Sequence, residues 1–233
     1  MAKYSIILAT LVRKKRHIEM VEKCIERIKT FSKDYELIIV DDDSKYHSDF
    51  LREQANVYIH HMNGNKGCAV SWNDGLRAAR GQYLVVISDD VFVTEGWLEC
   101  MVNALTLFPN ALASMPAVSH MPSGIKPEEI RTWIPACCFM LRPETLDIVG
   151  YFDEQFHPFN YEDVDFWTRI FESGHTIARD YSVMVRHDEG QVIHSFEDNG
   201  EVDAANRKRY LEKWGFDPIP ILYHGTSKFP WEE

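Results

Sequence analysis

Acidic residues that directly follow apolar runs are the part of this sequence best suited to chemistry. Three aspartates at 41–43 follow the run 36–40, and Asp89 and Asp90 follow the run 83–87 and one serine. An aspartate at a strand end can accept the N–H of a nucleobase. Two adjacent carboxylates repel each other, and a divalent cation shared with phosphate oxygens removes that repulsion. Simpler roles stay open: a helix cap for residues 41–43, and a solvated turn for Asp89 and Asp90.

A third acidic group consists of Glu162, Asp163 and Asp165, at the expected start of a helix and among aromatic residues. A carboxylate in such a place can act as a general base and take the proton of an attacking hydroxyl. Acidic residues in a first helical turn also stabilise the helix dipole without any catalytic role. Both interpretations are open from the residues alone.

Apolar runs and helical spacings predict the elements that must position these groups. The predicted strands lie at 5–9, 36–40, 56–61, 83–87 and 111–116, and the predicted helices at 18–28, 67–79, 97–108, 163–173 and 202–214. Short, wholly apolar strands are typical of a parallel sheet covered on both faces, so the fold class is α/β. Ligands of such a sheet bind beyond the carboxyl ends of its strands. The Pro- and Gly-bearing segment 116–127 is expected to be a mobile loop.

Composition excludes several classes of protein. The 233 residues include 25 Lys+Arg and 36 Asp+Glu, a formal net charge of −11, with 45% hydrophobic residues, which is typical of a globular domain. Five cysteines, odd in number and without a Cys-x-x-Cys pair, predict no zinc site and fit a reducing cytoplasm. No secretory signal and no apolar run of about 18 residues is visible, so we expect a cytoplasmic protein, at most peripheral to a membrane.

The first strand is followed by neither a Gly-rich turn nor an aspartate. The missing glycines exclude the dinucleotide-binding fingerprint, and the missing aspartate excludes phosphatases that use an aspartyl nucleophile there. Four cations instead occupy positions 13–16. They either form a solvated face or bind a diphosphate or an anionic acceptor.

Several motifs in this order and spacing resemble those of family-2-type glycosyltransferases with the GT-A fold, over roughly residues 4–195. The matching segments are Val-Asp-Asp-x-Ser at 40–44, Asn-x-Gly at 65–67 and 73–75, Ala-Arg-Gly at 79–81, Ser-Asp-Asp at 88–90 in the place of the metal-binding motif, Gly-x-Phe-Asp at 150–153, and Glu-Asp at 162–163. The match is imperfect at the end of the first strand, which reads Ala-Thr-Leu-Val at 9–12, and at Trp72, where many members carry Arg.

The resemblance implies a GT-A domain over 1–195, with a mixed, mostly parallel central sheet and helices on both faces. Within it, 1–115 would be the nucleotide-sugar half and 116–195 the acceptor and catalytic half, with 196–233 a C-terminal extension packed on the same domain. The implied reaction moves a sugar from a nucleotide-diphosphate donor, a UDP-sugar being favoured, with inversion and with help from Mn²⁺ or Mg²⁺. The acceptor would be a glycan, a lipid-linked sugar or another hydroxyl-bearing polymer, and a nucleic acid stays open.

The same resemblance assigns roles to individual residues. Asp163 would be the catalytic base, with Glu162 beside it, and the metal would be held by Asp90 and His187, with His194 as a weaker second choice. The donor would be bound by Thr10, Asp42, Lys66, Asn73 and Asp89. Trp72 and Trp133 could stack on a sugar or fill the core. Two alternatives remain: a relative that binds nucleotides or sugars without catalysis, and a nucleotidyltransferase.

Overall fold

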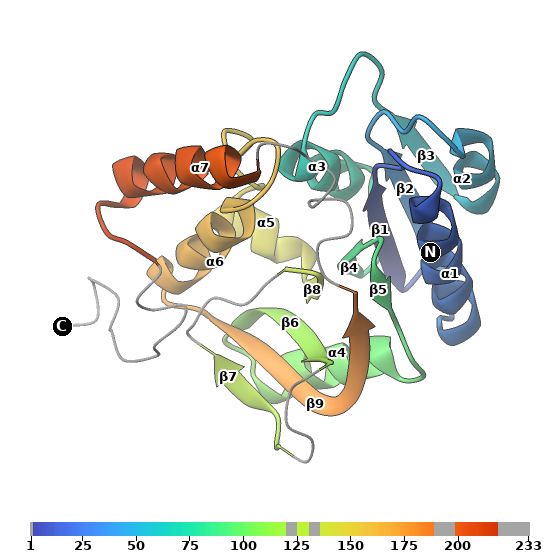
Figure 1. Cartoon of the computed structure of the whole chain (residues 1–233). Helices are drawn as coiled ribbons and strands as arrows, with labels where there is room; N and C mark the ends of the chain where they lie inside the picture. Colours follow the sequence, from blue (N-terminus) through green and yellow to red (C-terminus); the bar gives the residue numbers. More distant parts are fainter. Residues whose placement is uncertain (1, 120–124, 131–135, 189–198, 219–233) are drawn as a thin grey trace.

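The structure is a computed structural model that describes residues 2–119, 125–130, 136–188 and 199–218 (Figure 1). Its strands are β1 (Tyr4–Thr10), β2 (Tyr35–Asp41), β3 (Val57–His60), β4 (Tyr83–Ser88), β5 (Val91–Phe92), β6 (Ala111–Val118), β7 (Glu128–Ile130), β8 (Cys138–Leu141) and β9 (Thr176–His187). Its helices are α1 (Arg16–Phe31), α2 (Ser48–Gln54), α3 (Cys68–Ala78), α4 (Trp97–Leu107), α5 (Pro143–Val149), α6 (Glu162–Glu172) and α7 (Asn199–Trp214). None of these helices is both long and apolar enough to span a bilayer.

The strands form one mixed sheet in the order β3-β2-β1-β4-β8-β6-β9-β5, and β7 pairs with β9 from outside this path. The first four strands are parallel, while β8 runs antiparallel to β4 and to β6. The predicted α/β class and the mostly parallel, doubly covered sheet are confirmed.

Alternate residues of the parallel strands point to opposite faces of the sheet, and both faces are buried. Ile6 and Leu8 belong to the core on one face, together with α1 and α4, whereas Ile7 belongs to the core on the other face with α3 and α6. The apolar run in the middle of β1 therefore has a physical reason: each of its residues packs into an apolar core on one face of the sheet or the other.

Helix α3 lies unusually close to the sheet because one of its residues has no side chain. A Cβ atom built on Gly75 would lie 2.2 Å from Cγ2 of Ile7 on β1. The close approach sets Ser71 and Trp72, one turn earlier on α3, against the strand ends.

The predicted strands and helices all exist, including the helices predicted at 163–173 and 202–214, with shifted ends. The structure adds α2, β5, β7, β8, α5 and β9. One expectation is partly wrong. The predicted loop does not begin at residue 116, because β6 continues to Val118, which pairs with Val185 of β9. Backbone pairing to a neighbouring strand here overrides the turn tendency of Pro116. Residues 120–124 of that segment lie outside the described part of the chain.

Candidate active site

A cavity of about 250 Å³ opens at the carboxyl ends of β1, β2 and β4. It is lined by strand ends, by α3, by the chain before β8 and by the chain that leads into α6. The lining residues are Ala9, Thr10, Leu11, Asp42, Asn65, Cys68, Ser71, Trp72, Ser88, Asp89, Asp90, Ala136, Cys137, Pro158, Phe159, Asn160, Glu162, Asp163 and His187. Seven of the nine residues predicted for the site are in this lining, and Lys66 and Asn73 are not.

Strand register brings the first of these residues together. Thr10 lies opposite Asp41 in the parallel pair β1–β2, and Ala9 lies opposite Ser88 in the pair β1–β4. The hydroxyl of Thr10 donates to Oδ2 of Asp89 at 2.6 Å. Both side chains are buried. The end of β1, where the sequence differs from the motif of the similar family, therefore still positions Asp89 through Thr10.

Of the three aspartates after β2, only Asp42 lines the cavity. Its Oδ1 accepts the backbone N–H of Lys66 at 2.8 Å, and its Oδ2 accepts that of Gly67 at 3.0 Å. A ring nitrogen of His61 lies 2.8 Å from Oδ1, and the other ring nitrogen lies 2.9 Å from Asp74. Asp42 is therefore held from two sides with its carboxylate at the cavity wall.

The other two aspartates hold the loops around the site. Asp41 accepts hydrogen bonds from the backbone of Ser44 and from the hydroxyls of Ser48 and Tyr58. Asp43 accepts the N–H of Gly64. None of the described contacts is a side-chain cap on α2, so the helix-cap alternative does not describe this group.

The long strand β9 brings His187 to Asp90. A register shift between Pro116 and Ala117 bends the β6–β9 pair, and the end of β9 then pairs with β5, with His187 opposite Val91 (Figure 1). As a result Nε2 of His187 lies 3.2 Å from Oδ1 of Asp90, and both side chains are mostly buried.

Asp89, Asp90 and His187 form one corner of the cavity, and their charges strongly affect one another. Burial, followed by the charge of Asp90, raises the pKa of Asp89 to about 7. Burial alone would lower the pKa of His187, but its contacts with Asp90 and Cys137 outweigh burial and raise that pKa to about 10. Asp89 and Asp90 therefore form an acidic site that favours the binding of a positively charged group.

The residues of this corner fit a hard divalent cation. Asp90 and His187 supply an oxygen and a nitrogen ligand side by side, and Mg²⁺ or Mn²⁺ commonly takes one or two protein ligands and completes its shell with phosphate oxygens and water. The described residues contain no cluster of three or more His, Cys, Asp or Glu that could hold a metal without such help. A cation here would depend on the diphosphate.

Glu162 and Asp163 open α6 and line the same cavity. Oδ1 of Asp163 accepts the N–H of Val164 at 2.8 Å, and Oδ2 accepts that of Ala136 at 3.2 Å. Oε2 of Glu162 is buried and has no hydrogen-bond partner among the described residues. Burial raises the pKa of both carboxyls, and the charge of Asp163 raises that of Glu162 further. Glu162 is buried and Asp163 is partly buried at the cavity wall, which suits proton transfer.

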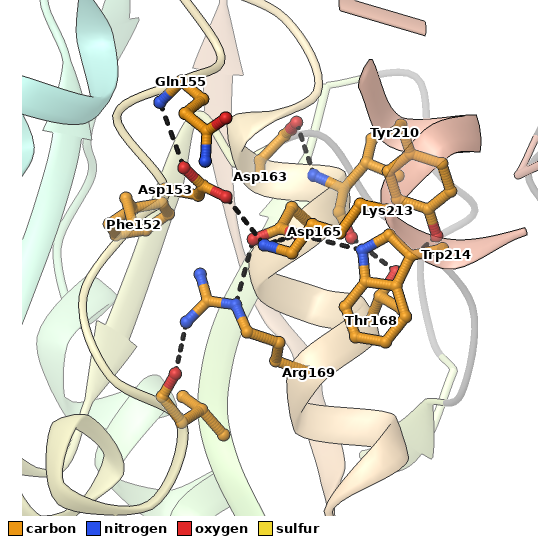
Figure 2. A network of polar contacts seen from close by, with 12 residues as sticks. Phe152, Asp153, Gln155, Asp163, Asp165, Thr168, Arg169, Tyr210, Lys213 and Trp214 are labelled. Carbon is orange, nitrogen blue, oxygen red and sulfur yellow. Dashed lines mark hydrogen bonds and ion pairs between the residues drawn. The ribbon is translucent and has the colours of Figure 1, made fainter. Parts of the chain in front are cut away.

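Asp165 has a different role. It is fully buried and is bound by Nε of Arg169 at 2.9 Å, by Nζ of Lys213 at 2.7 Å and by Nε1 of Trp214 at 2.9 Å (Figure 2). It joins α6 to α7 and does not belong to the cavity lining.

Three predicted donor or metal residues lie elsewhere or outside the description. Asn73 binds the backbone N–H and C=O of Phe152 and the carboxylate of Glu154 and is not in the lining. Lys66 takes part through its backbone N–H. His194, like Trp133, falls outside the described residues.

Trp72 both lines the cavity and packs in the core, edge-on against Phe139 and Phe152. The side chains of Lys14, Lys15 and Arg16 are exposed. They follow Leu11, which lines the cavity, by a few residues.

Sequence reasoning missed His61 and the wall formed by residues 158–160. His61 comes directly after β3, so the rule that ligand-binding residues follow parallel strands could have found it. Residues 158–160 belong to an irregular segment with no periodic pattern, and no signal marks them.

Comparison with known proteins places this geometry in context. The family model for glycosyl transferase family 2 matches residues 5–187. A pre-mycofactocin glycosyltransferase of Mycobacterium tuberculosis is 25% identical over 188 residues, which cover 70% of this chain and 40% of the relative. The uncharacterized glycosyltransferase YwdF of Bacillus subtilis is 29% identical over 245 residues, which cover 94% of this chain and 86% of the relative. The chain thus spans less than half the length of the mycobacterial relative.

Three solved structures share the fold. GalNAc-T7 with UDP, GalNAc and Mn²⁺ has a TM-score of 0.73 at 12% identity, covering 96% of this chain and 50% of that one. The mannosyltransferase PcManGT of Pyrobaculum calidifontis with GDP-Man and Mn²⁺ has a TM-score of 0.69 at 16% identity, covering 94% and 67%. TarS of S. aureus with UDP-GlcNAc has a TM-score of 0.64 at 17% identity, covering 90% and 66%. The chain has the GT-A fold and belongs to glycosyl transferase family 2.

Proposed function

We propose that this protein is a metal-dependent, inverting glycosyltransferase that moves a sugar from a nucleotide-diphosphate sugar to an acceptor hydroxyl. One observation carries the proposal: Asp42, the Asp90–His187 pair and the Glu162–Asp163 pair line a single cavity. A protein that only bound a nucleotide would have little use for a second buried acidic pair, because each buried charge costs free energy.

Asp42 would accept an N–H of the nucleobase. Its oxygens are oriented by the backbone of Lys66 and Gly67 and by His61, so the carboxylate is preorganised before the donor arrives. We favour uridine, and two of the structural relatives were solved with UDP or UDP-GlcNAc. The third was solved with GDP-Man, so guanosine is the competing choice.

Asp90 and His187 would hold the divalent cation, with Asp89 near it and oriented by Thr10. When bound, the cation neutralises the negative charge that develops on the leaving diphosphate. Structures with Mn²⁺ among the relatives support this choice of ion.

Asp163 would act as the general base. Two backbone N–H groups fix its carboxylate, and burial raises its pKa toward the range in which a carboxylate accepts protons well. It would take the proton of the acceptor hydroxyl as that oxygen attacks the anomeric carbon, while the bond to the diphosphate breaks on the opposite side of the ring. Glu162, whose Oε2 has no partner among the described residues, would accept a hydrogen bond from a hydroxyl of the bound sugar or acceptor.

The first test is thermal unfolding with UDP, GDP, dTDP and CDP, each with Mn²⁺, Mg²⁺ or a chelator, on the wild type and on Asp90→Ala. A ligand at about 100 times its Kd stabilises a protein by about 2.7 kcal/mol, which raises Tm by roughly 5–10 °C in a chain of this size. We expect such a rise for one nucleotide with metal, and none in Asp90→Ala. If no nucleotide raises the Tm of the wild type under any metal condition, the proposal is contradicted.

The second test concerns catalysis. With the nucleotide known, Asp163→Asn should lower sugar transfer, or hydrolysis of the donor by water, about 10²- to 10⁴-fold and leave nucleotide affinity unchanged. If the wild type and Asp163→Asn bind the nucleotide equally in the presence of metal, and the wild type shows no turnover with any acceptor, the binding-only alternative is favoured. The anomeric configuration of the product, read by NMR, decides whether the reaction inverts.

A further inference from the structure

The wall of the cavity beside the acidic pair is an irregular segment, residues 157–161. Pro158, Phe159 and Asn160 line the cavity, and the segment leads directly into Glu162 and Asp163. The conformation of this segment therefore fixes both the shape of the wall and the place where α6 begins.

The segment adopts a costly backbone conformation. Asn160 and Tyr161 are consecutive and have φ values of 70° and 72°, in the left-handed region that residues with a Cβ atom seldom occupy. Such a conformation persists only where the surrounding structure holds it. The described contacts show what does so.

One buried side chain of α7 binds the backbone of this segment. Nδ2 of Asn206 donates to the carbonyl of Phe159 at 2.7 Å and to the carbonyl of Asn160 at 3.0 Å. Its Oδ1 accepts a hydrogen bond from Arg209 at 2.6 Å, which fixes the orientation of the amide. Asn206 is fully buried, so water does not compete for these bonds.

The opposite side of the segment contacts the donor half of the cavity. The carbonyl of Pro158 accepts the N–H of Cys68, the first residue of α3, at 2.8 Å. A Cβ atom on Gly67 would lie 2.8 Å from the same carbonyl oxygen, so the two segments are in close contact. The N–H of Gly67 in turn donates to Asp42. Residues 157–161 thus link the nucleobase side to the acidic pair.

Helix α7 is itself anchored to α6 away from the cavity. Tyr210 and Thr168 share a hydrogen bond of 2.7 Å between their hydroxyls, and Trp214 donates to Asp165 (Figure 2). These contacts fix the position of α7, which carries Asn206. Tyr210, Thr168, Trp214 and Asp165 are not among the residues that line the cavity.

We propose that Asn206 is a positioning residue for sugar transfer: through the carbonyls of Phe159 and Asn160 it holds the cavity wall and aligns Glu162 and Asp163. The proposal rests on the proposed function for its catalytic consequence. It assigns to the C-terminal helix a role in the reaction, although no residue of α7 belongs to the cavity lining.

The test compares Asn206→Asp with Tyr210→Phe. Asn206→Asp keeps the shape of the side chain, removes the two N–H donors of the amide and sets a carboxylate against the carbonyls of His157, Phe159 and Asn160. Tyr210→Phe is a matched control, because it removes a buried hydrogen bond between α7 and α6 and keeps the ring that packs against Tyr161. Circular dichroism and Tm establish that both variants fold before anything else is measured.

Two readouts are needed. In hydrogen exchange, Asn206→Asp should speed exchange in peptides covering residues 66–70 and 157–163 by at least about tenfold, and Tyr210→Phe should not, because the Cys68–Pro158 bond depends on the held segment. In steady-state kinetics, Asn206→Asp should lower kcat by roughly 10- to 100-fold while the Kd of the nucleotide with Mn²⁺ changes less than about threefold.

Equal exchange in the two variants, or wild-type kcat in Asn206→Asp, would overturn the proposal. A wild type that transfers no sugar, together with the expected exchange difference, would count against the proposed function and leave the hold of Asn206 on the segment established.

Discussion

At the scale of single residues, the candidate site concentrates carboxylates in a place where they are costly. Asp42, Asp89, Asp90 and Glu162 are all buried, and Asp163 lies beside Glu162. Contacts with backbone N–H groups and with His61 offset part of the desolvation free energy of Asp42, and the contact with His187 does the same for Asp90. Glu162 has an oxygen without a described partner, so its charge is the least compensated of the group.

Glu162→Gln should therefore stabilise the free protein at neutral pH. Burial and the charge of Asp163 raise the folded-state pKa of Glu162 above its unfolded value, so the folded state binds more protons and stability falls as pH rises between the two values. Above both values the whole penalty is present, and the neutral amide removes it. We expect Tm to rise by a few degrees at pH 7.5, since about 1 kcal/mol moves Tm by roughly 2–4 °C in a chain of this size.

The gain should disappear near pH 4, where unfolded Glu162 is itself largely protonated. Glu172→Gln, at the exposed end of the same helix, serves as the control and should leave Tm unchanged. A lower Tm for Glu162→Gln at pH 7.5 would mean that the carboxylate makes a stabilising contact and that its burial does not dominate. If Glu162 also serves the reaction, the stabilised variant should be slower.

At the scale of elements, the strand ends are placed by register and the helices by close packing on the sheet. Gly75 tests the second part, because two effects of Gly75→Ala oppose each other. Alanine is the better helix former by about 1 kcal/mol. Its Cβ, however, would lie 2.2 Å from a methyl group of Ile7, which is fully buried on β1 and cannot move aside.

Overpacking of this kind costs about 1–3 kcal/mol, so we expect the steric effect to win and Gly75→Ala to lower the free energy of unfolding in urea. Gly200→Ala is the matched control, since a Cβ there meets no atom within 4 Å in the described structure and the residue also lies in a helix. It should be neutral or stabilising. Equal effects of the two substitutions would show that α3 can shift on the sheet.

The sequence allowed the parallel half of the sheet to be predicted because each strand is a short apolar run that both faces of the sheet require. It also allowed Asp42, Asp90 and Asp163 to be chosen, because each follows such a run or opens a strongly patterned helix. The two-residue strand β5 and the seven-residue helix α2 carry too few positions for a period to show. The hold of Asn206 on residues 157–161 spans more than forty residues of sequence and has no local signal.

At the scale of the whole molecule, the negative net charge disfavours the approach of the proposed anionic donor. The chain carries a formal charge of −11, and a nucleotide-diphosphate sugar is also an anion. The basic run 13–16 is the exception, and it follows β1 at the cavity edge of the sheet. Its exposed members Lys14, Lys15 and Arg16 form no ion pair with any described residue, and they stand at the start of α1, where the helix dipole disfavours cations.

We expect this run to attract the donor over a distance. Changing Lys14, Lys15 and Arg16 together to Gln should lower kcat/KM for the donor severalfold at low ionic strength, chiefly through KM. The difference should shrink as salt rises to about 0.5 M, because exposed charges are screened within a few ångströms there. The variant should not lose stability, since removal of cations from a helix N-terminus is neutral or favourable.

The control removes the same charge from the opposite edge of the sheet. Lys3, Lys33 and Arg80 are exposed and stand just before β1, β2 and β4, at the strand ends remote from the cavity. Their combined change to Gln alters the net charge equally, so it should leave kcat/KM within about twofold at every ionic strength. If both triple variants respond alike, net charge governs the encounter, and if neither responds, residues 13–16 are a solvated face. Only a salt-sensitive loss confined to residues 14–16 shows that an acidic protein keeps a local basic entrance for an anionic donor.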